Sequence, residues 1–390
     1  MIYLSKPSMI TALGDNATTM ALLRENKCGI ELKECGSKDF MLGSVKRLAP
    51  LPKDLDEKFA TRTNMLLYNA LLPHMDIIKK IQHLTDNSMF VSIGTTNSGV
   101  EENYNDFKNG VLSKSTTHKA ALSNGADFIA KILDLKVPTL GISTACTSGS
   151  KALIAAARAI EANLYDAAIC GGADGLSTLS IYGFDSLKIL SSTQSIPFDM
   201  NRDGINIGEG AAIFIMLSER LYKVLAADFP LVLKGYASNN DAFHITKPSE
   251  CFSMQRCLLQ DVLNMANLLP QEIDYINLHG TGSEANDMME GSVINEIFGE
   301  TTPCGSTKML LGHTLGAAGA IEAAICGNLI IDSMTYKSTT LPPHKIGQYD
   351  KKIPKINLVG TEQVTLQNAL SLSFAFGGDN SALILGAANV

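Results

Sequence analysis

The sequence is poor in charged residues and has no tryptophan. Only 18% of its 390 residues are charged, whereas 45% are hydrophobic and 32 are glycine. This composition excludes a disordered, collagen-like or coiled-coil chain, because those classes need a high charge density or a strict short repeat. The length allows two or three domains and a sizeable buried core.

An excess of positive charge is also absent. The chain has 32 Lys and Arg against 39 Asp and Glu, which gives a net charge of −7. A general binder of nucleic acid or of an anionic membrane surface is usually basic. We therefore expect no nucleic-acid partner, and an acidic partner protein would have to bind a local group of Lys and Arg side chains.

Metal and redox motifs are missing as well. No two of the eight cysteines form a Cys-x-x-Cys pair, and no Cys/His cluster has zinc-ligand spacing. A chain of this length needs no disulfides, so we expect no metal, and most thiols to be small buried side chains in a reducing cytosol. The cysteines are Cys28, Cys35, Cys146, Cys170, Cys251, Cys257, Cys304 and Cys326.

No signal peptide or membrane span is expected. The N-terminal sequence MIYLSKPSMITALGDN lacks a charged segment followed by a long apolar one. The most membrane-like stretch, residues 312–331, contains His313, Glu322 and several glycines, so we interpret it as a buried helix. The expected location is cytoplasmic.

Short β-rich runs alternate with helical patterns along the chain, which is typical of an α/β layered fold with largely buried sheets. The runs are residues 89–95, 167–170, 211–217, 275–278 and 381–385. No low-complexity segment or Pro/Ser-rich linker separates them, so any domains are fused tightly.

Two parts of the chain resemble each other. Residues 143–163 and 306–328 both pass from a polar loop into an Ala-rich helix, and residues 204–217 and 374–386 both place a Gly-rich turn before a strand. This weak repeat predicts two similar halves joined near residues 220–232.

Cys146 occupies the most informative segment. PTLGIS (138–143) has the pattern of a strand, TACTSG (144–149) of a tight turn and residues 150–163 of a helix. The positive end of that helix favours a thiolate, and a nucleophile on such a turn is exposed while its own N–H helps to bind an oxyanion. The alternative from local features alone is that Cys146 merely fills a tight corner.

Two histidines lie beside glycines at the ends of elements. His279 directly follows an apolar strand, and His313 lies in a Gly-rich approach to a helix, five residues after Lys308. Neutral imidazoles can donate to or accept from a thioester carbonyl, and a nearby ammonium would bias their protonation. Each histidine could instead be structural, and Lys308 could be an ordinary surface charge.

These motifs resemble the β-ketoacyl-acyl-carrier-protein synthases, and most closely the elongating condensing enzymes with a Cys-His-His triad. The resemblance runs in order along nearly the whole chain. It is carried by TACTSG around Cys146, GFDSLKILSS (183–192), PFDMNRDGINIGEGAA (197–212), DAFHITKP (241–248), LHGTGSEAND around His279, STKMLLGHTLGAAGAIE around Lys308 and His313, and SFAFGGDNSALIL near the C-terminus.

The resemblance implies the thiolase fold of the α/β class, in which two duplicated halves form a five-layered α-β-α-β-α core. Residues 1–226 would form the half with the nucleophilic cysteine, and residues 227–390 the half with both histidines. It also implies a homodimer, with a heterodimer with a related chain as the alternative.

The resemblance also implies a decarboxylative condensation. Cys146 would accept an acyl group from an acyl-carrier-protein thioester, with its own N–H and that of Phe376 forming the oxyanion hole. His279 and His313 would stabilise the enolate-like species that forms when a malonyl thioester loses carbon dioxide. The product would be a 3-oxoacyl thioester two carbons longer, in fatty-acid or polyketide-type elongation.

Further roles follow from the same resemblance. Lys308 would hold the histidine pair electrostatically with support from Glu322. Thr281 and Ser283 would bind the pantetheine arm. The oxyanion hole and gate would comprise Cys146, Phe374, Phe376 and Gly377. No metal or free cofactor would be required, because phosphopantetheine arrives on the acyl carrier protein.

Several positions depart from the family pattern. Ile196 and Ile205 replace a common arginine and a usual aromatic residue, Ser283 stands in place of a second threonine, and Asp379 places a negative charge where threonine is usual. The alternatives are a non-catalytic chain-length-factor subunit and a structural or carrier-docking subunit. Cys146 argues against the first, and the second histidine argues against initiating enzymes with a Cys-His-Asn set.

Overall fold

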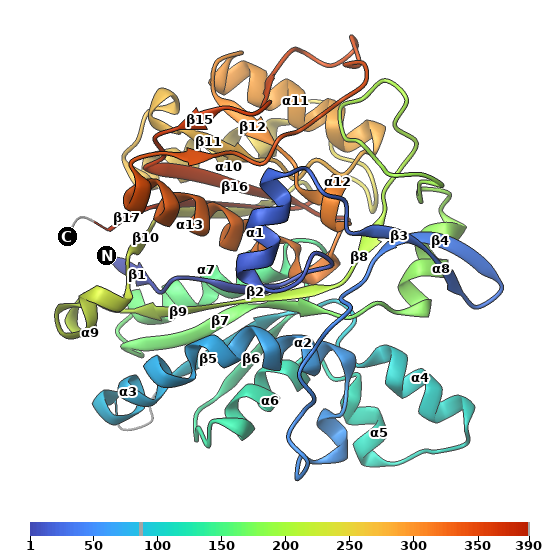
Figure 1. Ribbon diagram of the computed structural model, residues 1–390, viewed down its shortest axis with the longest axis vertical. Helices are drawn as coiled ribbons and strands as arrows, with labels where there is room; N and C mark the ends of the chain where they lie inside the picture. The colour runs from blue at the N-terminus through green and yellow to red at the C-terminus, as the bar shows by residue number, and fades with distance from the viewer. Residues whose placement is uncertain (86–88, 389–390) are drawn as a thin grey trace.

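The computed structural model describes residues 1–85 and 89–388 and has five alternating layers of helices and strands (Figure 1). Helices α7 (Ser148–Glu161) and α13 (Ala318–Tyr336) pack against each other in the central layer. Helices α2 (Arg62–Leu71) and α6 (Asn124–Ile132) form an outer layer on one side. Helices α10 (Ser253–Ala266) and α11 (Glu284–Phe298) cover the other side. The expected thiolase-like α/β architecture is confirmed.

One sheet region lies between α7 and the outer helices α2 and α6. Its strands run in the order β9 (Gly210–Leu217), β7 (Ala167–Asp174), β5 (Phe90–Gly94) and β6 (Thr139–Ile142). Strand β9 is antiparallel to β7, and the next two pairings are parallel. Every residue of β7 and β9 is buried, as expected for strands covered on both faces.

The second sheet region repeats this order. Strand β17 (Asp379–Ala387) is antiparallel to β16 (Asn368–Phe374), and β16, β11 (Tyr275–Asn277) and β12 (Pro303–Gly305) then pair in parallel. Strands β10 (Leu231–Asn240) and β1 (Ile2–Leu4) join the two regions into one continuous sheet. The repeated pairing supports our proposal of two halves, 1–226 and 227–390.

The remaining elements extend this core. The strands are β2 (Ser8–Ile10), β3 (Ile30–Cys35), β4 (Lys38–Gly43), β8 (Ile207–Gly208), β13 (Thr339–Thr340), β14 (Asn357–Leu358) and β15 (Gln363–Val364). The helices are α1 (Asn16–Arg24), α3 (Met75–Thr85), α4 (Val100–Lys108), α5 (Lys114–Lys119), α8 (Thr178–Ser186), α9 (Glu219–Leu225) and α12 (Lys308–Leu311).

All five predicted strands are present, and the membrane-like stretch is a core helix. The segment Leu315–Tyr336 has the length and apolarity of a membrane span, but 89% of its most apolar window is buried inside the protein. Helix α13 begins at Ala318 and not at Gly312, because residues 312–317 form a separate approach to it with a short 3-10 turn at Leu315–Ala317.

The expectation that most cysteines are buried is wrong. Only Cys170, Cys304 and Cys326 are buried, whereas three cysteines are exposed and two are partly exposed. The buried three lie in β7, β12 and α13, where a small apolar side chain fits between layers. All eight are free thiols.

Glycines allow α7 and α13 to approach closely at their N-terminal ends. A Cβ atom at Gly149 would lie 2.8 Å from the backbone nitrogen of Ala320 and 2.9 Å from the carbonyl oxygen of Gly316. A Cβ atom at Gly316 would lie 2.7 Å from the backbone nitrogen of Thr96 and 2.7 Å from a carboxylate oxygen of Asp174. The contacts at Gly149 therefore set how closely α7 approaches α13, and those at Gly316 set how closely the segment before α13 approaches Thr96 and Asp174.

The substitution Gly149→Ala should therefore destabilise the protein. We expect a loss of about 1–3 kcal/mol in the free energy of unfolding, because the added methyl group overpacks the junction of the two helices. The matched control is Gly183→Ala in α8, where no atom lies within 4 Å of the new Cβ. That change should be neutral or stabilise by up to about 1 kcal/mol. Urea unfolding of both variants tests this, and equal effects would contradict it.

Candidate active site

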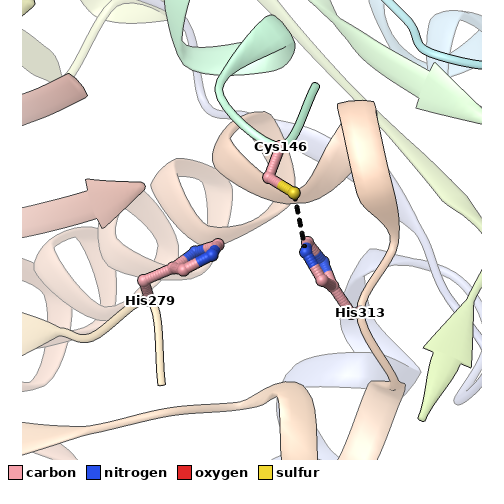
Figure 2. Close-up of side chains that lie close together, drawn as sticks. All are labelled: Cys146, His279 and His313. Carbon is pink, nitrogen blue, oxygen red and sulfur yellow. Dashed lines mark hydrogen bonds between the residues drawn. The ribbon is translucent and has the colours of Figure 1, made fainter. Parts of the chain in front are cut away.

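Cys146 lies on the turn between β6 and α7, as predicted. The preceding residue, Ala145, has a left-handed backbone with φ of 53°, which turns the chain sharply. The N–H of Ser148 donates to the Ala145 carbonyl (3.1 Å), and the N–H of Thr144 donates to Ser148 Oγ (2.9 Å). These bonds present the Cys146 sulfur toward two histidines (Figure 2).

Burial opposes the Cys146 thiolate that the helix end is expected to favour. Burial raises the pKa of the Cys146 thiol to about 12, although the positive charge of Lys308 acts in the opposite direction. Loss of solvation of the thiolate is therefore the largest influence on the pKa of this thiol. The sulfur needs a proton acceptor before it can attack.

His313 is placed to be that acceptor. Its Nε2 lies 3.0 Å from Cys146 Sγ (Figure 2). The His313 N–H donates to the Asn206 carbonyl (2.7 Å), and the Gly208 N–H donates to the His313 carbonyl (2.9 Å). Burial and, secondarily, the charge of Lys308 hold the pKa of His313 well below its usual value, so the imidazole is neutral.

His279 follows β11 and faces the same sulfur from the other side (Figure 2). Its ring lies 5.3 Å from that of His313, at 85°. Burial, Lys308 and His313 hold the pKa of His279 well below its usual value. Lys308 Nζ lies 3.2 Å from His279 Nδ1, and an ammonium can only donate. His279 Nδ1 is therefore the acceptor, and Nε2 carries the proton.

Lys308 and Glu322 form a buried ion pair behind His279, so the alternative of an ordinary surface lysine is wrong. Lys308 is 6% exposed and Glu322 is 2% exposed, and Lys308 Nζ donates to Glu322 Oε1. Burial raises the pKa of Glu322 to about 7 against the opposing effect of Lys308. A buried charge is costly without a partner of opposite charge, so Lys308 and Glu322 each stabilise the other in its buried position.

Glu290 is a site residue that the sequence did not reveal. Its Oε1 accepts the backbone N–H of His279 (2.6 Å), and its Oε2 accepts that of Gly280 (2.7 Å). It lies on the buried side of α11, eleven residues after His279, where a carboxylate in a helix ordinarily faces solvent. Glu290 can be buried because its carboxylate accepts hydrogen bonds from a distant part of the chain. No local sequence pattern indicates such bonds.

Cys146, His279 and His313 also form a potential metal-ligand set, because one ligand atom of each lies within 4.8 Å of the others. The tautomer of His279 opposes this use. Nε2 is the ring nitrogen on the side away from Lys308, and it carries the proton because Nδ1 accepts from Lys308. The arrangement therefore fits a carbonyl oxygen better than a metal ion.

Phe374 and Phe376, the residues expected to form the gate, line the same cavity as the two histidines. The Phe374 ring lies 6.1 Å from that of His279, and the Phe376 ring lies 6.0 Å from that of Phe184. Within the described residues, neither the Cys146 N–H nor the Phe376 N–H has an acceptor. Gly377 differs, because its N–H donates to the Ile245 carbonyl (2.8 Å), so this glycine provides a left-handed backbone (φ 85°) and not a free donor.

A cavity of about 390 Å³ joins these residues to the surface. Thr281 and Ser283 lie on its wall with their hydroxyl oxygens 3.0 Å apart. Phe184, Ile189 and Ile205 are among the apolar residues that line it. A mostly apolar cavity with a pair of hydroxyl groups suits a largely apolar ligand that carries a few polar groups.

The comparisons with known proteins agree with this geometry. The family models for the N-terminal and C-terminal domains of β-ketoacyl synthases match residues 63–221 and 231–340. A 3-oxoacyl-[acyl-carrier-protein] synthase 2 of Mycobacterium bovis is 30% identical over 77% of this chain and 75% of its own length. The chain belongs to the β-ketoacyl synthase family.

Two further relatives cover different shares of this chain. The 3-oxoacyl-[acyl-carrier-protein] synthase 2 of Coxiella burnetii is 33% identical over 68% of this chain, and the alignment covers 66% of that relative, just under two thirds. A chain of the solved complex of ketosynthase ApeO with its chain length factor ApeC from Xenorhabdus doucetiae is 36% identical. It covers 99% of this chain and 98% of its own length, with a TM-score of 0.91.

Glu290 should give this β-ketoacyl synthase a distinctive pH dependence. Burial raises the pKa of Glu290 to about 8 from an ordinary value near 4.5, so the folded protein retains a proton that the unfolded chain has lost. The stabilisation from that proton should decrease by up to roughly 1.4 kcal/mol per pH unit as the pH rises from 4.5 to 8.

The free energies of unfolding of the wild type and of Glu290→Gln, measured from pH 5 to pH 8, test this dependence. The glutamine cannot titrate, so the wild type minus variant difference should fall as the pH rises. A difference that stays constant or increases would contradict the raised pKa.

Proposed function

We propose that this protein is a β-ketoacyl-acyl-carrier-protein synthase that joins an acyl group held on Cys146 to a malonyl unit, with loss of carbon dioxide. The observation that carries the proposal is the contact of Cys146 Sγ with His313 Nε2 at 3.0 Å, beside a second imidazole whose tautomer Lys308 fixes. A thiol, a proton acceptor and an N–H donor meet in one cavity.

In the first half-reaction, the Cys146 proton moves to His313 Nε2 as the sulfur attacks the thioester carbonyl of an acyl-carrier protein. The carbonyl oxygen becomes an oxyanion, and the free N–H groups of Cys146 and Phe376 are its proposed donors. The carbon–sulfur bond of the donor then breaks. The departing thiolate takes the proton from His313 and leaves as the free carrier thiol.

In the second half-reaction, a malonyl thioester loses carbon dioxide, and the electron pair of that bond forms an enolate. His279 Nε2–H donates to the enolate oxygen. His313 donates to the same oxygen only as its Nε2–H tautomer, because Nε2 gave its earlier proton to the departing thiol. The enolate carbon attacks the acyl–Cys146 carbonyl, so that a carbon–carbon bond forms and the bond to sulfur breaks. The Cys146 thiolate then takes one proton from solvent, which completes the balance.

The surroundings of the cavity support a carrier-bound substrate. Thr281 and Ser283 are the proposed ligands of the pantetheine arm, and Lys247 also lines the cavity. Phosphopantetheine would arrive on the acyl carrier protein, so no metal or free cofactor enters the scheme. A homodimer, or a heterodimer with a chain-length-factor-like chain, and a cytoplasmic location complete the proposal.

A non-catalytic role as a chain-length-factor or structural subunit is the second candidate. Its support is the match to a complex that contains both a ketosynthase and a chain length factor. Three contacts favour the enzyme: Cys146 with His313, His279 with Lys308, and Lys308 with Glu322. A buried ion pair is costly, and a non-catalytic subunit has no need of one behind a histidine.

Acylation of Cys146 separates these two candidates. After incubation with an acyl-loaded carrier protein, the intact mass of the wild type should increase by one acyl group. The Cys146→Ala variant should show no increase, since no other described thiol lies beside a histidine in the cavity. An unmodified wild type would overturn the proposed enzyme.

The two histidines should affect the half-reactions differently. His279→Ala should acylate within a few-fold of the wild-type rate but fail to condense, because it removes the N–H donor to the enolate. His313→Ala should slow acylation about 100-fold as well, since the thiol loses its proton acceptor. Separate assays of acyl loading and carbon dioxide release measure both steps. Condensation at the wild-type rate by either variant would refute its role.

A further inference from the structure

The turn that carries Phe376 has its own internal bonds. The Ala375 N–H donates to the Asp379 carbonyl (2.8 Å), and the Gly378 N–H donates to the Ala375 carbonyl (3.1 Å). Gly377 and Gly378 both have left-handed backbones. Two adjacent glycines of this kind give the turn little stiffness of its own, so its position depends on what holds its ends.

One side of this turn is bonded to the second half of the chain. The Gly377 N–H donates to the Ile245 carbonyl (2.8 Å), and the Asp241 N–H donates to the Gly378 carbonyl (2.7 Å). Asn240 Nδ2 also donates to the Gly377 carbonyl (3.1 Å). These partners all follow or end β10, so none of these bonds fixes the turn relative to Cys146.

The bonds to the first half of the chain run through the Asp379 side chain. Lys151 Nζ donates to Asp379 Oδ2 (2.6 Å). The single proton of the Thr147 hydroxyl is shared between the Thr144 carbonyl (2.7 Å) and Asp379 Oδ1 (3.1 Å). Among the described residues, every hydrogen bond from residues 375–379 to residues 1–226 ends on this carboxylate. Thr147 is buried and directly follows Cys146.

We propose that Asp379, Lys151 and Thr147 are positioning residues that set the distance between the Phe376 N–H and the Cys146 N–H. The two proposed oxyanion donors belong to segments that are more than 200 residues apart in the chain, and a hole of two donors works only at a fixed separation. Asp379 connects the segments, since its carbonyl closes the Phe376 turn and its carboxylate bonds the first turn of α7.

Burial strengthens this connection. The Lys151 side chain is 21% exposed and that of Asp379 is 15% exposed, so solvent screens the pair less than an exposed ion pair. The carboxylate also lies at the positive end of α7, which favours a negative charge there. The charge at position 379 is therefore neutralised by α7. The inference rests on the proposed function in one respect, namely that the N–H groups of Cys146 and Phe376 bind an oxyanion.

The variants Asp379→Ala and Lys151→Met test the connection. Acyl transfer to Cys146 should slow about tenfold, because a displaced Phe376 N–H binds the oxyanion poorly. Alkylation of Cys146 by iodoacetamide passes through no oxyanion, so its rate should change by less than about twofold. The double variant should be no slower than either single one, and Lys151→Arg should retain most of the wild-type rate.

Asp166→Asn is the control, since it breaks the exposed ion pair with Arg220 and should leave both rates unchanged. Amide hydrogen exchange of residues 375–378 gives a readout that needs no activity, and it should become faster in Asp379→Ala. If acyl transfer and exchange both match the wild type, the inference is overturned. A wild type that is not acylated would refute the proposed function, while the exchange result would still decide whether Asp379 holds the turn.

Discussion

The close contact between the N-terminal ends of α7 and α13 determines the rest of the site. Cys146 and His313 lie a few residues before these helices, so the distance between sulfur and imidazole is set by how closely the two segments approach. Gly149 has no side chain at the point of contact, and a Cβ atom there would meet the backbone of Ala320 and Gly316 and separate the segments. Interiors pack densely and transmit such displacements, so the geometry of the reactive pair depends on the core.

Burial is the largest influence on the pKa of four groups in the site. The same loss of solvation that keeps both imidazoles neutral raises the pKa of the Cys146 thiol and of Glu322. The positive charge of Lys308 lowers the pKa of all four groups, so a change at Lys308 would alter the protonation of each of them. Its contact with Glu322 keeps that charge in place without solvent. A neutral resting site is therefore a property of the core and not of the motifs alone.

Local sequence patterns predicted an α/β layered fold and its strands, and they singled out Cys146, His279 and His313 because each lies at the junction of a strand or helix with a Gly-rich turn. The five layers and the roles of the three side chains came from the family resemblance. The local patterns failed where the outcome depends on distant parts of the chain. The local pattern favours a thiolate at the helix end, but it does not reveal the burial that raises the pKa of the Cys146 thiol. Glu290 was missed because its bonds to the His279 and Gly280 backbone exist only in the folded protein. The contacts of Asp379 with Lys151 and Thr147 join the two halves in the same way.

The packing of the two central helices has a consequence for the reactive pair. Cys146 lies two residues before α7, and His313 lies five residues before α13, so each side chain is carried on the approach to one of these helices. Neither approach holds both side chains. Sulfur and imidazole therefore become neighbours only when α7 and α13 pack together, and a fragment that contains one of these helices without the other would have no reactive pair.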